Sequence, residues 1–135
     1  MHIAEVGLRV KDLAGVVAFY QNVLGLELVH SSPNFVFMKA GDLDSPLGRG
    51  GHPQYLVLFD RDVALDVTLS TLDHLAFEIP LEQFDSERAR LEAMGLLERV
   101  RVWSGVGSFL RARSLFFSDP EGNTIELIAH DPSVT

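Results

Sequence analysis

The sequence predicts an α+β fold made of two copies of one unit, in which a strand and a helix are followed by three more strands. The first observation is the order of the expected elements, which is the same in each half of the 135 residues. The second is that "EVGLRV" aligns with "HLAFEI", and "LVLF" with "IELI", both at an offset of 69 residues. The third is that both expected helices end at a glycine, Gly25 and Gly95. Such internal repeats indicate duplicated structural units.

In the first half, residues 3–10 alternate apolar and polar side chains as a strand does. Asp12 is placed to cap a helix whose apolar positions recur at helical spacing up to Gly25. Residues 26–31, 34–41 and 55–61 are expected to be strands. The intervening "GDLDSPLGRGGHPQ" is rich in Gly, Pro and Asp, and we expect a long loop there.

The second half repeats this order, with a strand within residues 72–80, a helix over 81–94 and a strand over 96–103. We expect a loop over "SGVGSFLRAR", residues 104–113, because it contains two glycines. Residues 114–130 are expected to be a hairpin that turns at "DPEGN". The sequence thus predicts one domain, 1–135, with a first module of about 1–68 and a second of about 69–135.

The composition excludes several classes of function. Acidic residues outnumber basic ones by 19 to 11, giving a net charge of −8. That balance disfavours nucleic-acid binding, which needs clustered Lys and Arg, and it tolerates a bound cation. The absence of cysteine excludes disulfides, zinc–thiolate sites and thiol nucleophiles. No apolar run is long enough to span a membrane and the first residues lack the layout of a signal peptide, so a cytoplasmic location is expected.

Polar side chains interrupt three of the apolar strands. Glu5 lies within the first strand, and the 69-residue offset places His74 at the equivalent point of the second half. Glu126 is flanked by apolar residues, and its equivalent in the first half is Val57. A buried carboxylate is costly unless it is paired, hydrogen-bonded or bound to a cation. By strand alternation His74 and Glu126 point away from the bulkier apolar face, the side that should pack under a helix.

Three stretches together resemble the vicinal oxygen chelate superfamily, which includes glyoxalases, bleomycin-resistance proteins and extradiol dioxygenases: "GLRVKDLAGVVAFYQNVLGLEL", "LDHLAFEI" and "FFSDPEGNTIEL". The resemblance covers essentially the whole chain. It implies two βαβββ modules whose curved mixed sheets enclose a pocket, often in a homodimer. In metal-binding relatives four inward positions can ligate a divalent ion, and here they carry Glu5, Val57, His74 and Glu126. Valine cannot bind metal, and most such relatives have histidine in place of Glu5.

The resemblance therefore implies a metal site of Glu5, His74 and Glu126, with Glu5 and Glu126 also as catalytic residues. One imidazole and two carboxylates suit a hard-to-borderline divalent ion, and we expect Fe, Mn, Zn or Ni. Three ligands leave open positions for a small-molecule substrate and dioxygen, so a dioxygenase-like oxidation is the first expectation. A glyoxalase-like lyase or isomerase is the second, with Glu5 as the base. The third is a metal-free, bleomycin-resistance type of protein that binds a cationic drug.

Simpler explanations remain for each candidate. His74 could hydrogen-bond to Asp73 or Glu78, and Glu5 could pair with Arg9 on its own strand face. Further side chains are candidates for a substrate pocket, although solvated or core positions are as common for such residues. These candidates are Arg9, His52, Trp103, Arg111 and Arg113.

Overall fold

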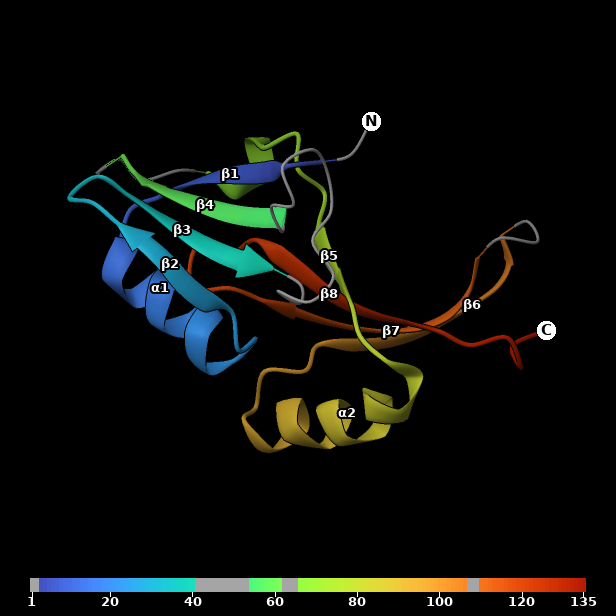
Figure 1. Cartoon of the computed structure of the whole chain (residues 1–135). Helices are drawn as coiled ribbons and strands as arrows, with labels where there is room; N and C mark the ends of the chain where they lie inside the picture. The colour runs from blue at the N-terminus through green and yellow to red at the C-terminus, as the bar shows by residue number, and fades with distance from the viewer. Residues whose placement is uncertain (1–2, 41–53, 62–65, 107–109) are drawn as a thin grey trace. The chain divides into compact units, whose positions relative to one another are not determined.

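The computed structural model describes residues 3–40, 54–61, 66–106 and 110–135 (Figure 1). The chain divides into two compact units, Met1–Asp66 and Val67–Thr135. Each unit contains one four-stranded mixed sheet, and neither sheet closes into a barrel. The two βαβββ units that the sequence predicts are therefore confirmed. None of the helices among the described residues is long and apolar enough to cross a membrane.

The first unit contains β1 (Glu5–Val10), α1 (Leu13–Asn22), β2 (Glu27–Ser31), β3 (Phe35–Ala40) and β4 (Gln54–Asp60). Its strand order is β1-β4-β3-β2, with β1 parallel to β4 and the other pairs antiparallel. As expected, Asp12 caps α1, since its Oδ1 accepts a hydrogen bond of 3.0 Å from the backbone N–H of Gly15. After the helix, Gly25 adopts a φ of +67°, which reverses the chain at little cost because glycine has no Cβ.

One face of the first sheet forms the core of this unit. α1 lies along that face (Figure 1) and contributes the buried side chains of Val16 and Tyr20. The strand residues that alternate toward the helix are buried: Leu8, Val10, Val36, Met38, Leu56 and Leu58. The opposite face carries Glu5, Gly7 and Arg9 of β1.

The second unit contains β5 (Leu75–Glu78), α2 (Phe84–Ala93), β6 (Arg99–Val106), β7 (Leu110–Ser118) and β8 (Thr124–His130), with short 3₁₀ turns at Val67–Leu69 and Leu81–Gln83. Its strand order, β5-β8-β7-β6, repeats that of the first unit. The expected hairpin at "DPEGN" is confirmed. Asp119 Oδ1 accepts the backbone N–H groups of Glu121 and Asn123, and Gly122 has a φ of +87°.

The loop expected over residues 104–113 is wrong for most of its length. Residues 104–106 continue β6 and residues 110–113 begin β7, while residues 107–109 lie outside the described part of the chain. The register between these strands shifts between Trp103 and Val106, as at a β-bulge. A glycine within a strand often marks such a bulge, so Gly105 did not require a loop.

The two sheets are equivalent residue by residue. In the first sheet Val6 pairs with Leu56, and in the second sheet Leu75 pairs with Ile125. The next pairs, Gly7 with Val57 and Ala76 with Glu126, match in the same way. The 69-residue offset therefore holds at the level of strand register. It makes Val57 and Glu126 structural equivalents.

Candidate metal centre

The candidate centre lies on the face of the second sheet that carries Glu126, which we name the site face. Register places Ala76, Glu126, Phe116 and Arg99 in one row across β5, β8, β7 and β6, so their side chains share this face. The alternate residues of these strands, including the buried Ile125, Leu127 and Leu115, occupy the opposite face. His74 immediately precedes β5 and reaches the site face.

His74 and Glu126 are in direct contact. The distance from His74 Nε2 to Glu126 Oε2 is 3.1 Å, and the other ring nitrogen, Nδ1, lies 2.6 Å from Asp73 Oδ1. The Glu126 side chain is 4% exposed and the His74 side chain 40% exposed. The ring of His74 also lies edge-on to Phe116, with 6.3 Å between the ring centres. The imidazole is thus oriented by two carboxylates and one aromatic ring.

One oxygen of Glu126 has no partner. Oε1 is buried and accepts no hydrogen bond among the described residues. Leaving a buried polar group unsatisfied costs about 1–3 kcal/mol, and more for a charged group. A carboxylate in this condition indicates that a further electropositive partner belongs beside it.

The two carboxylate contacts of His74 together need a positive charge. A neutral imidazole carries one N–H, so it donates to only one of Asp73 and Glu126, and at the other contact a ring lone pair faces a carboxylate oxygen and the two acceptors repel. Either a proton or a metal ion removes that repulsion. Two ligands at about 2.1 Å from an ion and at right angles lie about 3.0 Å apart, close to the observed separation. A proton between His74 and Glu126 would still leave Oε1 of Glu126 without a partner. These residues therefore fit a divalent ion better than they fit a proton.

Glu5 lies in the first unit, at the point of β1 equivalent to His74. It is exposed, and it forms no ion pair with Arg9 or with any other described residue. Within the described ranges no group of three His, Cys, Asp or Glu side chains is close enough to hold a metal. The structure therefore brings together two of the three expected ligands, both in the second unit. Val57 is fully buried.

The pocket candidates belong to different elements, and two of those in the second unit lie on opposite faces of its sheet. Arg9 is exposed on β1, His52 lies outside the described residues, and Arg111 is exposed near the start of β7. Trp103 lies on the site face, where its Nε1 donates a hydrogen bond of 2.8 Å to Ser114 Oγ. Arg113 pairs in register with Ala129, which places it on the opposite face. Its Nε donates to a buried carboxylate, Asp131 Oδ2, at 2.6 Å.

Two site-face residues were missed from the sequence. Arg99 lies over the ring of Phe116, with its Cζ 4.2 Å from the ring centre, and Arg101 lies over Trp103 at 4.1 Å. The signal was present in "RVRVW", whose alternation places both arginines and the tryptophan on one face.

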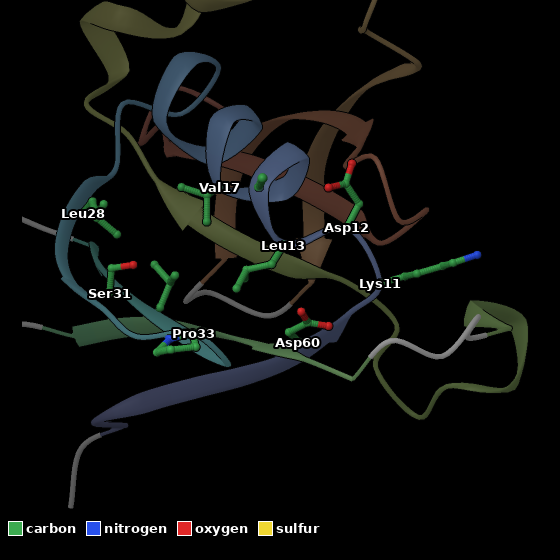
Figure 2. Close-up of a pocket in the computed structure, with 10 residues that line it drawn as sticks. Lys11, Asp12, Leu13, Val17, Leu28, Ser31, Pro33 and Asp60 are labelled. Atoms are coloured by element: carbon green, nitrogen blue, oxygen red, sulfur yellow. The ribbon is translucent and has the colours of Figure 1, made fainter.

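A separate groove lies on the helix side of the first unit. It has a volume of about 480 Å³ and contains none of the candidate site residues. Figure 2 shows Leu13 and Val17 of α1 on one wall and Leu28, Ser31 and Pro33 on the other. No unsatisfied buried polar atom lines it in the part of the chain that is described. We therefore place the candidate centre at His74 and Glu126.

Two βαβββ units of identical strand order define a glyoxalase/dioxygenase-like class of proteins. The family model "Glyoxalase/Bleomycin resistance protein/Dioxygenase superfamily" matches residues 2–127, so the chain belongs to this superfamily.

Relatives within the superfamily differ in activity. Glutathione transferase FosA of Serratia marcescens is 30% identical over 89% of this chain and 74% of that protein. Catechol-2,3-dioxygenase of Bacillus subtilis is 27% identical over 99% of this chain but only 43% of that protein. Lactoylglutathione lyase from Agrobacterium tumefaciens has a similar structure, with a TM-score of 0.70, 27% identity and coverage of 95% and 92% of the two chains.

One solved relative contains a metal ion. The fosfomycin resistance protein FosX from Listeria monocytogenes, in a complex with Mn(II) and a sulfate ion, has a TM-score of 0.69 and 25% identity, with coverage of 96% of this chain and 90% of that chain. The expected superfamily is thus confirmed. The relatives include enzymes with several different activities.

Proposed function

We propose that this protein is a divalent-metal-dependent enzyme that acts on a small molecule, with His74, Glu126 and Glu5 as the metal ligands. The observation that supports this most strongly is the buried, unpartnered Oε1 of Glu126 beside Nε2 of His74. Asp73 then has the role of a positioning residue, because a carboxylate on the far nitrogen fixes the orientation of the ring and presents Nε2 to the site. The presence of Mn(II) in the related FosX structure is consistent with such a site.

The donor set favours Mn(II) or Fe(II), because two carboxylates and one imidazole form an oxygen-rich set. When bound by these residues, such an ion would supply Lewis-acid polarisation to the oxygen atoms of a chelating substrate. The side chain of Glu5 has no partner among the described residues and is exposed, so it is the carboxylate best able to accept a proton from the substrate.

We further propose a non-redox reaction, namely group transfer, addition or isomerisation at a substrate with adjacent oxygen atoms. The proposed ligands differ from the two-histidine, one-carboxylate triad of non-haem iron oxygenases. The chain also covers more of the FosA relative than of the dioxygenase relative. The dioxygenase-like oxidation expected first from the sequence becomes the second candidate. It is supported by the 27% identity to catechol-2,3-dioxygenase along nearly the whole chain.

Glu5 comes from the first unit, so the complete centre requires either the first unit of the same chain or that of a second copy. We propose a homodimer. Mixing Glu5→Ala with His74→Ala protein distinguishes the two sources. In a dimer that shares its sites, random exchange restores about a quarter of them, because half the dimers are mixed and each mixed dimer has one intact site. If each site lies within one chain, mixing restores none.

The metal site is tested by elemental analysis and Mn(II) titration of protein purified without chelators. We expect one ion per chain in the wild type and at least a tenfold loss of Mn(II) affinity in His74→Ala and Glu126→Gln. The control is His130→Ala, which removes another histidine near a carboxylate of the same sheet. His130 lies on the same strand as Glu126, its side chain is exposed, and its Nε2 is 4.0 Å from Glu78 Oε1. A wild-type protein that binds no divalent ion would contradict the proposal.

The reaction is tested with three assays, each with Mn(II) and with Fe(II). These are the loss of fosfomycin with and without glutathione, the turnover of a hemithioacetal, and oxygen uptake with catechol. Turnover in either of the first two that is abolished by Glu126→Gln supports the non-redox reaction. Oxygen uptake alone supports the second candidate.

A further inference from the structure

Two guanidinium groups lie over aromatic rings of the site face. Arg99 lies over Phe116, which is 4% exposed, and Arg101 lies over Trp103. Trp103 is itself held by its hydrogen bond to the buried Ser114. Each arginine is therefore oriented by a ring that is fixed in the sheet. A stacked guanidinium of this kind is worth about 0.5–1 kcal/mol at an exposed site.

Stacking leaves the hydrogen-bonding capacity of both arginines unused. A guanidinium contacts a ring through its flat face, while its five N–H donors point outward in its own plane. Neither Arg99 nor Arg101 has a carboxylate within 4 Å or a side-chain hydrogen bond among the described residues. This is notable in a chain with 19 acidic residues, where Arg88, Arg90 and Arg113 all have carboxylate partners.

The two arginines lie near the candidate metal centre. Arg99 is in the same row as Glu126, separated from it only by Phe116 on β7. Because neighbouring strands are about 4.8 Å apart, the backbones of Arg99 and Glu126 are roughly 10 Å apart. The ring of Phe116 contacts both the Arg99 guanidinium and the His74 imidazole. Arg101 is two residues further along the same strand face.

We infer that Arg99 and Arg101 form a subsite for an oxyanion, the phosphoryl or carboxylate group of a substrate whose other end reaches the metal. This inference rests on the proposed metal-dependent function for the metal-bound end of the substrate. The planar donor fork of arginine matches the oxygen atoms of such groups in a bidentate manner. Two positive charges in a protein of net charge −8 also select for an anion at this place.

The test measures the binding of inorganic phosphate and of malonate by calorimetry, with Mn(II)-loaded and with chelator-treated protein. We compare the wild type with Arg99→Gln/Arg101→Gln. The matched control is Arg88→Gln, which changes an exposed arginine of α2 that pairs with Glu92. We expect at least tenfold weaker binding of one or both anions in the double variant and no change in Arg88→Gln. The anion that is affected identifies the phosphoryl or the carboxylate class.

A second variant, Arg99→Lys/Arg101→Lys, retains the charges and is expected to recover part of the affinity. If the arginines only covered the rings, neither the double Lys nor the double Gln variant would change the anion affinity. The inference is overturned if neither anion binds the wild type, or if the double Gln variant binds as tightly as the control. If the proposed metal site is wrong, the Mn(II) titration shows this separately. Anion binding by the chelator-treated protein still tests the arginine subsite in that case.

Discussion

Val57 and Glu126 occupy equivalent positions in the two sheets, and both are buried. The first unit thus shows what this position needs for packing, which is an apolar, β-branched side chain on a central strand. The carboxylate of Glu126 instead places a charged group at this position and leaves one oxygen without a partner. The metal site that we propose would account for this difference, because a metal-binding carboxylate would be kept there at some expense of stability.

Replacing Glu126 by the residue of the first unit tests that explanation. We expect Glu126→Val to abolish Mn(II) binding while leaving the free energy of unfolding of the metal-free protein unchanged or about 1 kcal/mol higher, because it removes a buried, half-satisfied charge. Urea unfolding in the presence of a chelator measures this. Glu126→Ala is the control and is expected to be less stable than Glu126→Val, since it leaves a cavity. A large loss of stability in Glu126→Val would mean that the carboxylate is structural.

Asp73 is expected to act through His74. We predict that Asp73→Asn weakens Mn(II) binding about tenfold, at the lower end of the range for such outer carboxylates, because the Asp73 side chain is 96% exposed. Mn(II) titration and the pH profile of activity are the measurements. A purely local structural role would alter thermal stability and leave Mn(II) affinity at the wild-type value.

Much of the fold follows from local signals in the sequence. The register of β1 with β4, and of β5 with β8, is set by alternating apolar residues, and the same pattern predicted the 69-residue offset. The caps are equally local: Asp12 has a side chain that reaches its own helix, and Gly25 and Gly95 adopt the positive φ that other residues avoid.

The positions of the arginines were harder to predict. Residues 110–113 were expected to be a loop, so no strand face could be assigned to Arg113. Once β7 extends to Leu110, pairing with β8 places Arg113 opposite Ala129 and away from Glu126. The contact of His74 with Glu126 joins residues 52 positions apart, and it was expected from the resemblance to metal-binding relatives and not from any local pattern. The stacking of Arg99 on Phe116 depends on the same non-local register.

Phe116 is expected to be the main apolar support of the site face. It is 4% exposed and contacts both the His74 ring and the Arg99 guanidinium. Phe116→Ala is predicted to lower the free energy of unfolding by about 3 kcal/mol, as is usual for a buried aromatic residue. Phe116→Leu should cost about 1 kcal/mol, because it refills most of the volume. Urea unfolding measures both, and equal costs would show that ring packing is unimportant.

Gly95 offers a test of the end of α2. Its φ is +69°, and a Cβ placed there meets no heavy atom of the described residues within 4 Å. Gly95→Ala is therefore expected to cost about 1 kcal/mol through backbone conformation alone. Gly95→Asn should cost less, because asparagine tolerates this region better. Thermal unfolding compares the two variants, and an unchanged melting temperature in Gly95→Ala would refute the conformational argument.

Asp131 is expected to make the stability of the second unit depend on pH. Its Oδ1 accepts hydrogen bonds of 2.6 Å from Ser133 Oγ and 2.9 Å from Ser133 N, and Oδ2 accepts one from Arg113. The Ser133 hydroxyl, helped by the Ser133 N–H and by Arg113, holds the pKa of the Asp131 carboxyl below its ordinary 3.8, although burial opposes the shift.

Since the pKa of Asp131 is lower in the folded than in the unfolded protein, its stabilising effect is complete above the unfolded value and is lost as the pH falls through the folded one. We expect the free energy of unfolding of Asp131→Asn to be lower than that of the wild type, and the difference, or margin, to be constant from pH 8 to about pH 5. That margin should shrink below pH 3.8, where the unfolded carboxyl and then the folded one become protonated. Urea unfolding as a function of pH measures the margin. A margin that stayed constant down to pH 2 would show that the Asp131 charge does not stabilise the folded state.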